Sequence, residues 1–339
     1  MDLGLSDEQR ALVGSYGSLL AKASTPEDVR AAEPGGFDEE LWRLLLDTGV
    51  LLMAVPEERG GWGASLLDLA LVAELIGRHL APVPVIETQV AARLLAAASS
   101  ERAFDSLRAS LDGQQLVTLA LHSPRDGVAG LTPAGAICDS VVTFDGEGLC
   151  LAAVDVQARR PVVNLGGMPL ADLAVAGAIE LDAGPGAAEC FDRATDEWLV
   201  LMAAALAGMS ATAHEITCGY VSERRAFGGI IGGYQGVAHP LADDATAIDG
   251  ARLLAQKAAW ALDTGHARGR ELAAMAFAFA SETAARATYD AIHFHGGYGF
   301  MLEHDAQLYY RRARGWPRVW GGPEAAYARA AAARYGEMA

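Results

Sequence analysis

The chain has 339 residues, of which 52% are hydrophobic, so it is long enough to bury a large core shared by two or three domains. Its formal net charge of −17 gives an acidic surface that repels phosphate backbones, which argues against a nucleic-acid partner.

Cysteine usage and the N-terminus point to a reducing compartment. The four cysteines, Cys138, Cys150, Cys190 and Cys218, have no paired spacing, so neither disulfides nor a metal site is expected. The N-terminal residues carry acids where a signal peptide needs basic residues. The most apolar stretch, 199–213, is shorter than a bilayer crossing requires. We therefore expect a buried helix there, no membrane span and a cytoplasmic protein.

Helical patterns fill the N-terminal segment 1–112. Ser6 has the residue type of an N-cap, and apolar residues at helical spacing follow it over 7–23. A second helix is predicted over 37–55, where Pro56 ends it, and a third follows a Gly-rich turn and runs to residue 80. Two further helices are predicted over the ranges 87–99 and 101–111.

The segment 113–189 has a different pattern, typical of a small β domain. Short β-rich runs, separated by Gly, Pro and Asp, occupy residues 115–121, 140–146, 149–156 and 173–181. Helical periodicity returns at residue 190 and continues to the end, with helices over 196–227, 235–265 and 269–295 and a last one from Pro323. The order predicts an α+β, mostly α protein, in which 190–339 forms a four-helix bundle.

Two glycine-containing motifs stand out in the C-terminal segment. In "RRAFGGIIGGYQ", Arg224 and Gln235 flank Phe227 and Gly228; a guanidinium fork suits a pyrophosphate, and glycines allow close backbone approach. In "HFHGGYGF", His293 precedes the glycines Gly296, Gly297 and Gly299.

These motifs and the order of the segments resemble the acyl-CoA dehydrogenase family over nearly the whole chain, most strongly in its C-terminal half. The resemblance implies the acyl-CoA dehydrogenase fold, with FAD as cofactor. It further implies that both motifs meet the FAD of a neighbouring subunit, with Arg and Gln toward the pyrophosphate and Phe near the adenine. The residues so implied are Arg224, Phe227, Gly228, Gln235, His293, Gly296 and Gly297.

The middle segment departs from the family pattern. The family has a Thr-Glu-Pro-x-x-Gly-Ser-Asp loop and a Trp-Ile-Thr strand, which wall the flavin ring. Here the loop reads "LHSPRDGVAG", in which Pro124 is the retained residue, and the Trp-Ile-Thr strand is missing. The middle domain of this chain is therefore not expected to cradle a flavin ring alone.

The usual catalytic base is also missing. The family runs Tyr-Glu-Gly-Thr where this chain has "WGGP", so Trp320 takes the Tyr position and Gly321 the position of the catalytic Glu. Glu324, three residues on, begins a helix, and its carboxylate is expected to complement the helix N-terminus.

Some family members carry their base at the start of the helix preceding the first motif. The matching position here is Trp198, and Glu197 lies beside it. Two interpretations stay open: Glu197 is the base, or it is a structural carboxylate at a helix start, which we favour.

The leading hypothesis is a base-lacking small subunit, similar to those of heterotetrameric actinobacterial steroid side-chain acyl-CoA dehydrogenases. Such an enzyme introduces a Cα–Cβ double bond into a bulky acyl-CoA and passes electrons to an electron-transfer acceptor. This chain would supply the ADP half of the FAD site to a larger catalytic subunit in an α2β2 assembly. The alternatives are a self-sufficient homo-oligomeric dehydrogenase that uses Glu197 and a flavin-free structural subunit.

Overall fold

The structure is a computed structural model that describes residues 4–336. By its internal contacts the chain divides into two compact units. One unit takes its described residues from Met1–Arg30, Ala70–Ala81 and Leu199–Ala339. The other consists of Ala31–Leu69 and Pro82–Trp198.

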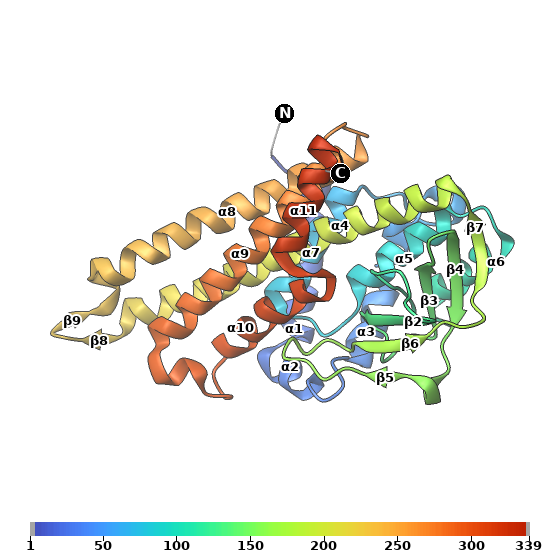
Figure 1. Ribbon diagram of the computed structural model, residues 1–339. Coiled ribbons are helices and arrows are strands. Elements are labelled where there is room, and N and C mark those ends of the chain that lie inside the picture. Colours follow the sequence, from blue (N-terminus) through green and yellow to red (C-terminus); the bar gives the residue numbers. More distant parts are fainter. Residues whose placement is uncertain (1–3, 337–339) are drawn as a thin grey trace. The chain divides into compact units, whose positions relative to one another are not determined.

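The second unit combines helices with two small sheets (Figure 1). Its helical elements are α3 (Glu39–Asp47), η1 (Leu52–Ala54), η2 (Glu57–Arg59), α5 (Val85–Ala97), α6 (Glu101–Leu111) and η3 (Val156–Ala158). Its strands are β1 (Val117–Leu119), β2 (Val128–Thr132), β3 (Ser140–Phe144), β4 (Gly148–Ala153), β5 (Arg160–Pro161), β6 (Ala171–Ala174) and β7 (Ile179–Ala183). One sheet has the order β1-β3-β4-β7, in which β1 and β3 are parallel, and the other is the antiparallel β2-β6-β5.

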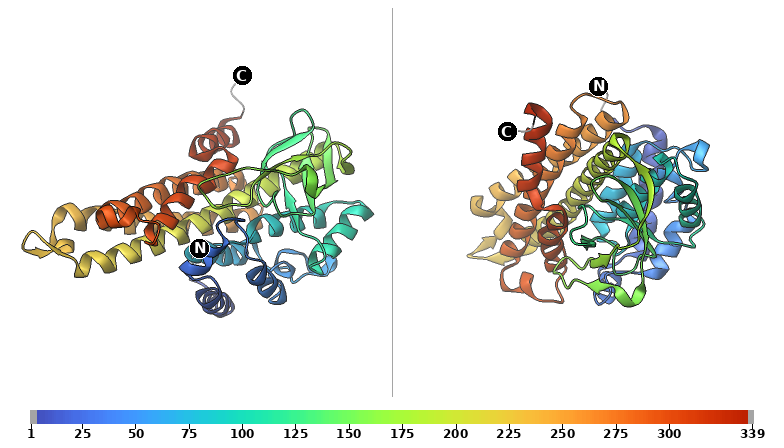
Figure 2. Two further views of the ribbon diagram at one scale, coloured as in Figure 1. Left: turned by 90° about the horizontal axis from the view of Figure 1, so that it is seen from below. Right: turned by 45° about the vertical axis from the view of Figure 1, so that its right-hand side comes forward.

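The first unit is helical apart from one hairpin. It contains α1 (Asp7–Ala23), β8 (Arg225–Ala226), β9 (Gly229–Ile230), η4 (Ile231–Gly233), α8 (Gln235–Asp263), α9 (Gly269–His295), η5 (Gly296–Phe300), α10 (Ala306–Gly315), η6 (Trp316–Trp320) and α11 (Gly322–Tyr335). Three helices, α2 (Pro26–Ala32), α4 (Leu66–His79) and α7 (Pro185–Glu223), have residues in both units. Figure 2 shows the β8–β9 hairpin extending past the ends of α7 and α8.

The predicted class, α+β and mostly α, is confirmed. The N-cap prediction is also confirmed, because the Ser6 hydroxyl accepts a hydrogen bond from the amide of Gln9, whose side chain in turn caps Ser6. The helices α2 and α10 and the strands β2, β5, β8 and β9 were not predicted, and the single run predicted over 173–181 belongs to two strands, β6 and β7.

The helix predicted over 37–55 is shorter in the structure. It ends at Asp47 because Gly49 adopts a left-handed conformation with φ of 77°, and the chain continues as the short η1. A Cβ at Gly49 would lie 2.1 Å from the Trp62 ring, so the turn requires glycine.

The apolar stretch 199–213 lies within α7, which has 39 residues. By length and composition alone the whole helix would suffice to cross a bilayer, although the stretch 199–213 is only part of it. The apolar window is 78% buried within the protein, as in the core helix of a globular fold. The prediction that the stretch is a buried helix is therefore confirmed.

Two glycines bring α4 and α7 into close contact within the first unit. A Cβ at Gly77 would lie 1.8 Å from the carbonyl oxygen of Ala205, and one at Gly208 would lie 2.0 Å from that of Glu74. Each glycine thus receives the backbone of the opposite helix, and no side chain fits at either position.

We expect Gly77→Ala and Gly208→Ala each to lower the free energy of unfolding by about 1–3 kcal/mol, because the added methyl overpacks this contact. Gly219→Ala is the matched control, because Gly219 also lies on α7 and a Cβ added there would have no atom within 4 Å. That change should be neutral or raise stability by about 0.5–1 kcal/mol. Denaturant unfolding measures all three, and equal stability of Gly77→Ala and Gly219→Ala would contradict the close contact.

Candidate functional site

The first motif forms a rigid hairpin at the end of α7. Strands β8 and β9 are joined by Phe227 and Gly228, which have φ values of 53° and 86°, as in a type I′ turn. The Tyr234 hydroxyl donates to the carbonyl oxygen of Phe227 at 2.9 Å and to that of Ala226 at 3.2 Å. The Phe227 side chain is 96% exposed. The hairpin therefore presents an aromatic ring that contributes little to the core of its own chain.

Arg224 and Gln235 lie at the two ends of this hairpin. The Arg224 side chain is exposed, and no described residue forms a hydrogen bond or ion pair with its guanidinium. Gln235 is exposed and begins α8, whose N-cap residue Tyr234 makes no side-chain capping bond. An exposed guanidinium and an uncapped helix N-terminus both favour a bound anion such as a phosphate.

The second motif begins where α9 ends. Gly296 has φ of 63°, and a Cβ at Gly296 or at Gly297 would have no atom of the protein within 4 Å. A Cβ at Gly299 would instead lie 2.9 Å from the carbonyl oxygen of Ile292, so that glycine serves internal packing. Gly296 and Gly297 thus leave an open backbone surface, as a site for close ligand approach needs.

His293 lies in the last turn of α9 and is exposed. Its ring is nearly parallel to that of Tyr289, with centroids 6.2 Å apart. The histidine at this position is therefore accessible to a ligand beside the glycines.

An aromatic contact between half-buried Tyr220 and buried His295 holds the two motifs at one end of the helices. The ring of Tyr220, in the last turns of α7, stacks on that of His295 at 4.4 Å. The carbonyl oxygen of Tyr220 also accepts a hydrogen bond from the amide of Arg224, and His295 directly precedes Gly296. The ends of α7 and α9 lie together in Figure 1 as this contact requires.

The tautomer of His295 and the charge of the neighbouring His304 follow from their surroundings. The Nδ1 atom of His295 lies 2.7 Å from the carbonyl oxygen of Ala291, which only accepts, so Nδ1 carries the proton. His304 lies 4.4 Å from His295, and burial, followed by the charge of His295, lowers the pKa of His304. A pKa below the usual value of about 6.5 leaves the His304 ring neutral at pH 7. His304 therefore adds no positive charge beside His295 at pH 7.

The Gly321 region is a turn that needs glycines. Gly321 and Gly322 join η6 to α11 with φ values of 108° and 77°. A Cβ at Gly321 would lie 2.9 Å from the Cβ of Ala325. A glutamate at this position would therefore be strained both by its backbone conformation and by this contact. The left-handed backbone conformation of Gly321 is thus consistent with the absence of a catalytic glutamate at this position.

Glu324 is exposed and pairs with another exposed residue. Its Oε2 atom lies 3.3 Å from the guanidinium of Arg318, on the preceding η6. It also stands in the first turn of α11, where a carboxylate is favourable. The ion pair and the position at the helix N-terminus together account for Glu324 as a structural residue, without a catalytic role.

Glu197 is buried in the second unit and engaged by two arginines. Its carboxylate accepts two hydrogen bonds from the Arg93 guanidinium, at 2.8 and 3.0 Å, in a bidentate pair. It accepts a third from Nε of Arg193 at 3.1 Å. These donors occupy both carboxylate oxygens, whereas a base needs an oxygen available to the substrate. The group lines a cavity of about 380 Å³ together with Cys190 and Glu58. Glu197 therefore has the contacts of a structural carboxylate.

Trp198, at the position that matches the alternative base, is fully buried. Its indole Nε1 donates to Oε1 of Glu87 at 3.3 Å, and burial raises the pKa of Glu87. The tryptophan fills the space at this helix position instead of presenting an acid–base group.

The loop that departs from the family pattern borders a cavity of about 620 Å³. Asp126 and Gly127, with φ of 51° and 72°, form a tight turn between Arg125 and Val128, an Asp-Gly hairpin signal that the sequence contains and that marks the start of β2. The residues that line the cavity are His122, Ser123, Pro124, Arg125, Val128, Gly130, Leu131 and Asp172. That no flavin ring binds here stays a prediction.

Within residues 4–336, no group of three or more His, Cys, Asp or Glu side chains has the geometry of a metal site. All four cysteines are free thiols, and burial raises the pKa of Cys138 to about 12.

Sequence reasoning missed Tyr220 and His295, which connect the two motifs. Each lies close in sequence to a motif residue, but their mutual contact joins positions 75 residues apart. Helical periodicity carries no signal for which rings of two helices meet.

Comparisons with known proteins match both ends of the chain to one family. Residues 6–106 match the model of the acyl-CoA dehydrogenase N-terminal domain, and residues 199–336 match that of the C-terminal domain. Acyl-CoA dehydrogenase IpdE2 of Mycobacterium tuberculosis is 33% identical over 94% of this chain and 94% of its own length.

Solved structures agree in fold. The ChsE4-ChsE5 complex of Mycobacterium tuberculosis includes a chain that matches with a TM-score of 0.88 and 24% identity, covering 100% of both chains. A chain of the Tcur3481-Tcur3483 steroid ACAD matches with a TM-score of 0.87 and 26% identity, covering 97% of this chain and 98% of that one.

Proposed function

The chain belongs to the acyl-CoA dehydrogenase family of flavin-dependent oxidoreductases, and we propose that it is the subunit that completes an FAD site held mainly by a partner. In this proposal it supplies the ADP half of the site, and a larger dehydrogenase subunit supplies the flavin-ring pocket and the catalytic base. The two kinds of chain would form an α2β2 assembly.

The observation that carries the proposal is the open end of the helical unit. The Tyr220–His295 stack brings Arg224 and the backbone of Gly296 and Gly297 to the same end, and all three are accessible. A purely structural subunit has no need of an exposed guanidinium beside two glycines that leave their Cβ positions open. This argues against the flavin-free alternative.

The residues present fit the ADP half of FAD. Arg224 offers a fork of donors for a phosphate, and the α8 N-terminus at Gln235 offers backbone N–H groups. Gly296 and Gly297 allow a phosphate to approach the backbone, and the exposed Phe227 ring offers a face on which adenine stacks. When bound, FAD supplies the hydride acceptor for Cα–Cβ desaturation of the thioester.

The proposal assigns the base to the partner. The two glutamates of this chain that lie near base positions are engaged in ion pairs, Glu197 with Arg93 and Arg193 and Glu324 with Arg318. Gly321 has no side chain at the usual position. The homo-oligomeric alternative requires Glu197 to leave two guanidiniums, which makes it the weaker hypothesis.

The names of similar proteins suggest the substrate class. The Tcur3481-Tcur3483 structure is of a steroid ACAD, so we propose a bulky acyl-CoA with a steroid-like acyl group as substrate. The paired names of both structural neighbours support a heteromeric partner, and an electron-transfer acceptor would reoxidise the flavin. The free thiols of all four cysteines support a cytoplasmic location.

The test is flavin reduction in the complex of this chain with a larger acyl-CoA dehydrogenase subunit that is co-expressed and purified with it. A steroid side-chain CoA thioester should bleach the flavin absorbance under anaerobic conditions. Octanoyl-CoA should do so at least about tenfold more slowly, because it fills less of a bulky acyl pocket. Equal rates would reject the bulky substrate, and no reduction by any acyl-CoA would reject the dehydrogenase activity.

A further inference from the structure

The segment that follows the open glycines is exposed and apolar. We call residues 298–305 the post-glycine segment. Four of its side chains, Tyr298, Phe300, Met301 and Leu302, are 49–73% exposed. Because these four side chains are largely exposed, they contribute little packing to the conformation of the segment, and its order depends on specific tethers.

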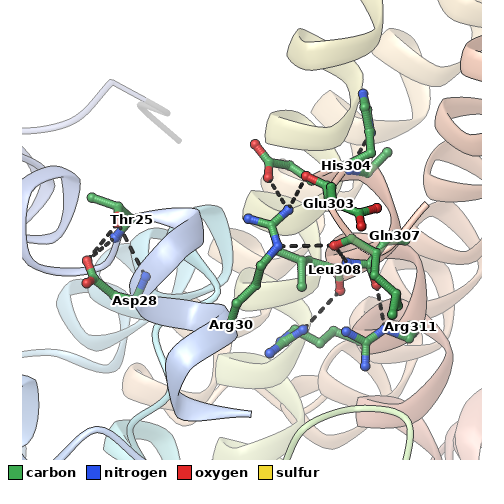
Figure 3. A network of polar contacts seen from close by, with 12 residues as sticks. Thr25, Asp28, Arg30, Glu303, His304, Gln307, Leu308 and Arg311 are labelled. Atoms are coloured by element: carbon green, nitrogen blue, oxygen red, sulfur yellow. Dashed lines mark hydrogen bonds and ion pairs between the residues drawn. The ribbon is translucent and has the colours of Figure 1, made fainter. Parts of the chain in front are cut away.

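Arg30, which lies on α2 and belongs to the same unit, makes most of the contacts that hold the post-glycine segment (Figure 3). Its Nε donates to the carbonyl oxygen of Leu302 at 3.2 Å, and one terminal nitrogen donates to that of Glu303 at 2.8 Å. The same nitrogen lies 2.6 Å from Oδ1 of Asp305. One guanidinium therefore holds three points along the post-glycine segment.

The position of Arg30 is itself fixed. Thr25 donates its backbone amide and its hydroxyl to Oδ2 of Asp28, at 2.9 and 2.8 Å, which closes the first turn of α2 around these residues. Arg30 lies two residues further along this short helix, and its side chain points to the post-glycine segment in Figure 3.

A second hydrogen bond to the Leu302 carbonyl oxygen comes from a residue that follows the post-glycine segment in the sequence. Gln307, in the first turn of α10, donates to the carbonyl oxygen of Leu302 at 3.1 Å. Arg311 donates to Oε1 of Gln307 at 2.7 Å and so orients its amide. The Leu302 carbonyl thus receives donors from two elements, α2 and α10, that are far apart in the sequence.

The segment is also connected to the glycines through aromatic rings. The His304 ring lies 4.6 Å from Tyr298 in an edge arrangement and 4.4 Å from His295. His295 directly precedes Gly296 and stacks on Tyr220. A displacement of residues 302–305 therefore moves the contacts of the residue that begins the open glycine surface.

We propose that Arg30 is a positioning residue for the cofactor site: through Leu302, Glu303 and Asp305 it holds the post-glycine segment, and with it Gly296 and Gly297, in the conformation that receives the cofactor. The inference rests on the proposed function of the glycines. The planar fork of arginine reaches two carbonyls and a carboxylate together, whereas a lysine ammonium is a point donor that reaches fewer of them at once.

The experiment uses the full chain alone and in complex with its larger subunit, with the variants Arg30→Ala, Arg30→Lys and Asp305→Ala. Hydrogen exchange of the amides of residues 297–304 is measured in the chain alone, and the rate of FAD release is measured in the complex. Arg30→Ala should raise exchange in this segment and speed FAD release by about tenfold or more, the effect of one or two lost charge-assisted bonds. Arg30→Lys should restore only part of the loss, and Asp305→Ala should give a smaller effect in the same direction.

Arg252→Ala is the matched control. Arg252 lies in the same unit and pairs with Glu74 at 2.7 Å and Asp249 at 3.0 Å, which are both outside the post-glycine segment. It should leave both readouts at wild-type values even if global stability falls. Wild-type FAD release from folded Arg30→Ala, or an equal effect of Arg252→Ala, would overturn the proposal. If Arg224→Ala also leaves the rate of FAD release unchanged, the proposed function itself is wrong. If FAD release is unchanged in the Arg30 variants but faster in Arg224→Ala, only the role proposed for Arg30 is wrong.

Discussion

Replacement of Glu197 by glutamine is expected to destabilise the protein without slowing the chemistry. The change leaves Arg93 and Arg193 beside a neutral amide, and loss of one partner from a buried ion pair typically costs about 3–5 kcal/mol. Because Arg193 is half exposed, we expect a smaller loss, about 2–4 kcal/mol in the free energy of unfolding. The rate of flavin reduction in single turnover should stay close to wild type.

A catalytic base would give the opposite pattern. Loss of a general base typically slows a reaction by about 10²–10⁴-fold. We expect a loss of that size when the corresponding carboxylate of the partner subunit is replaced. Glu324→Gln is the control in this chain, because its ion pair with Arg318 is exposed and both stability and rate should hardly change. A hundredfold slower reduction by Glu197→Gln, with flavin bound and the protein folded, would revive the homo-oligomeric alternative.

Arg224→Ala is expected to weaken FAD retention by the complex. The lost interaction is a charge-assisted hydrogen bond to a phosphate, worth about 1.5–3 kcal/mol. This corresponds to an affinity lower by about tenfold to a hundredfold, measured as flavin occupancy on dilution. No described residue pairs with this guanidinium, so its removal should not destabilise the chain.

Arg225→Ala is the matched control for this prediction. Arg225 is the next residue, equally exposed and of the same charge, but it lies on β8. Removing it changes the net charge by the same amount. Equal losses of FAD in the two variants would indicate a general electrostatic effect and contradict a specific contact of Arg224.

Much of the fold follows from local sequence signals. The cap formed by Ser6 and Gln9, the β-rich runs of the middle segment and the long Ala-rich helices depend on residues close in sequence. Composition, periodicity and capping rules therefore predict them. The end of α3 was predicted wrongly. The signal was present in Gly49, but its meaning depends on Trp62, which occupies the space of a side chain there.

The candidate site was predicted in part. Phe227 lies at the tip of one hairpin, and Arg224 and Gln235 lie just before and after it, so local sequence suffices to place the three residues together. Their approach to Gly296 depends on a ring contact between α7 and α9, and the order of the following segment depends on Arg30, over 270 residues away. Such long-range pairs leave no trace in periodicity or spacing.

The absence of a base at Gly321 was visible in the sequence, but its physical meaning was not. In the structure this residue and Gly322 adopt left-handed conformations that join η6 to α11. The position therefore lacks a carboxylate and also has a backbone that disfavours one, which makes a simple Gly321→Glu reversal costly by about 1–2 kcal/mol.

The count of FAD molecules per chain tests the central claim most directly. The chain alone, its larger subunit alone and their complex are each saturated with FAD, and bound flavin is measured against protein. The account predicts little flavin on the isolated chain and one FAD for each pair of unlike chains in the complex. One FAD per chain in a homo-oligomer of this protein alone would contradict it, and the cavity beside His122 and Arg125 would then be the place to look for the ring.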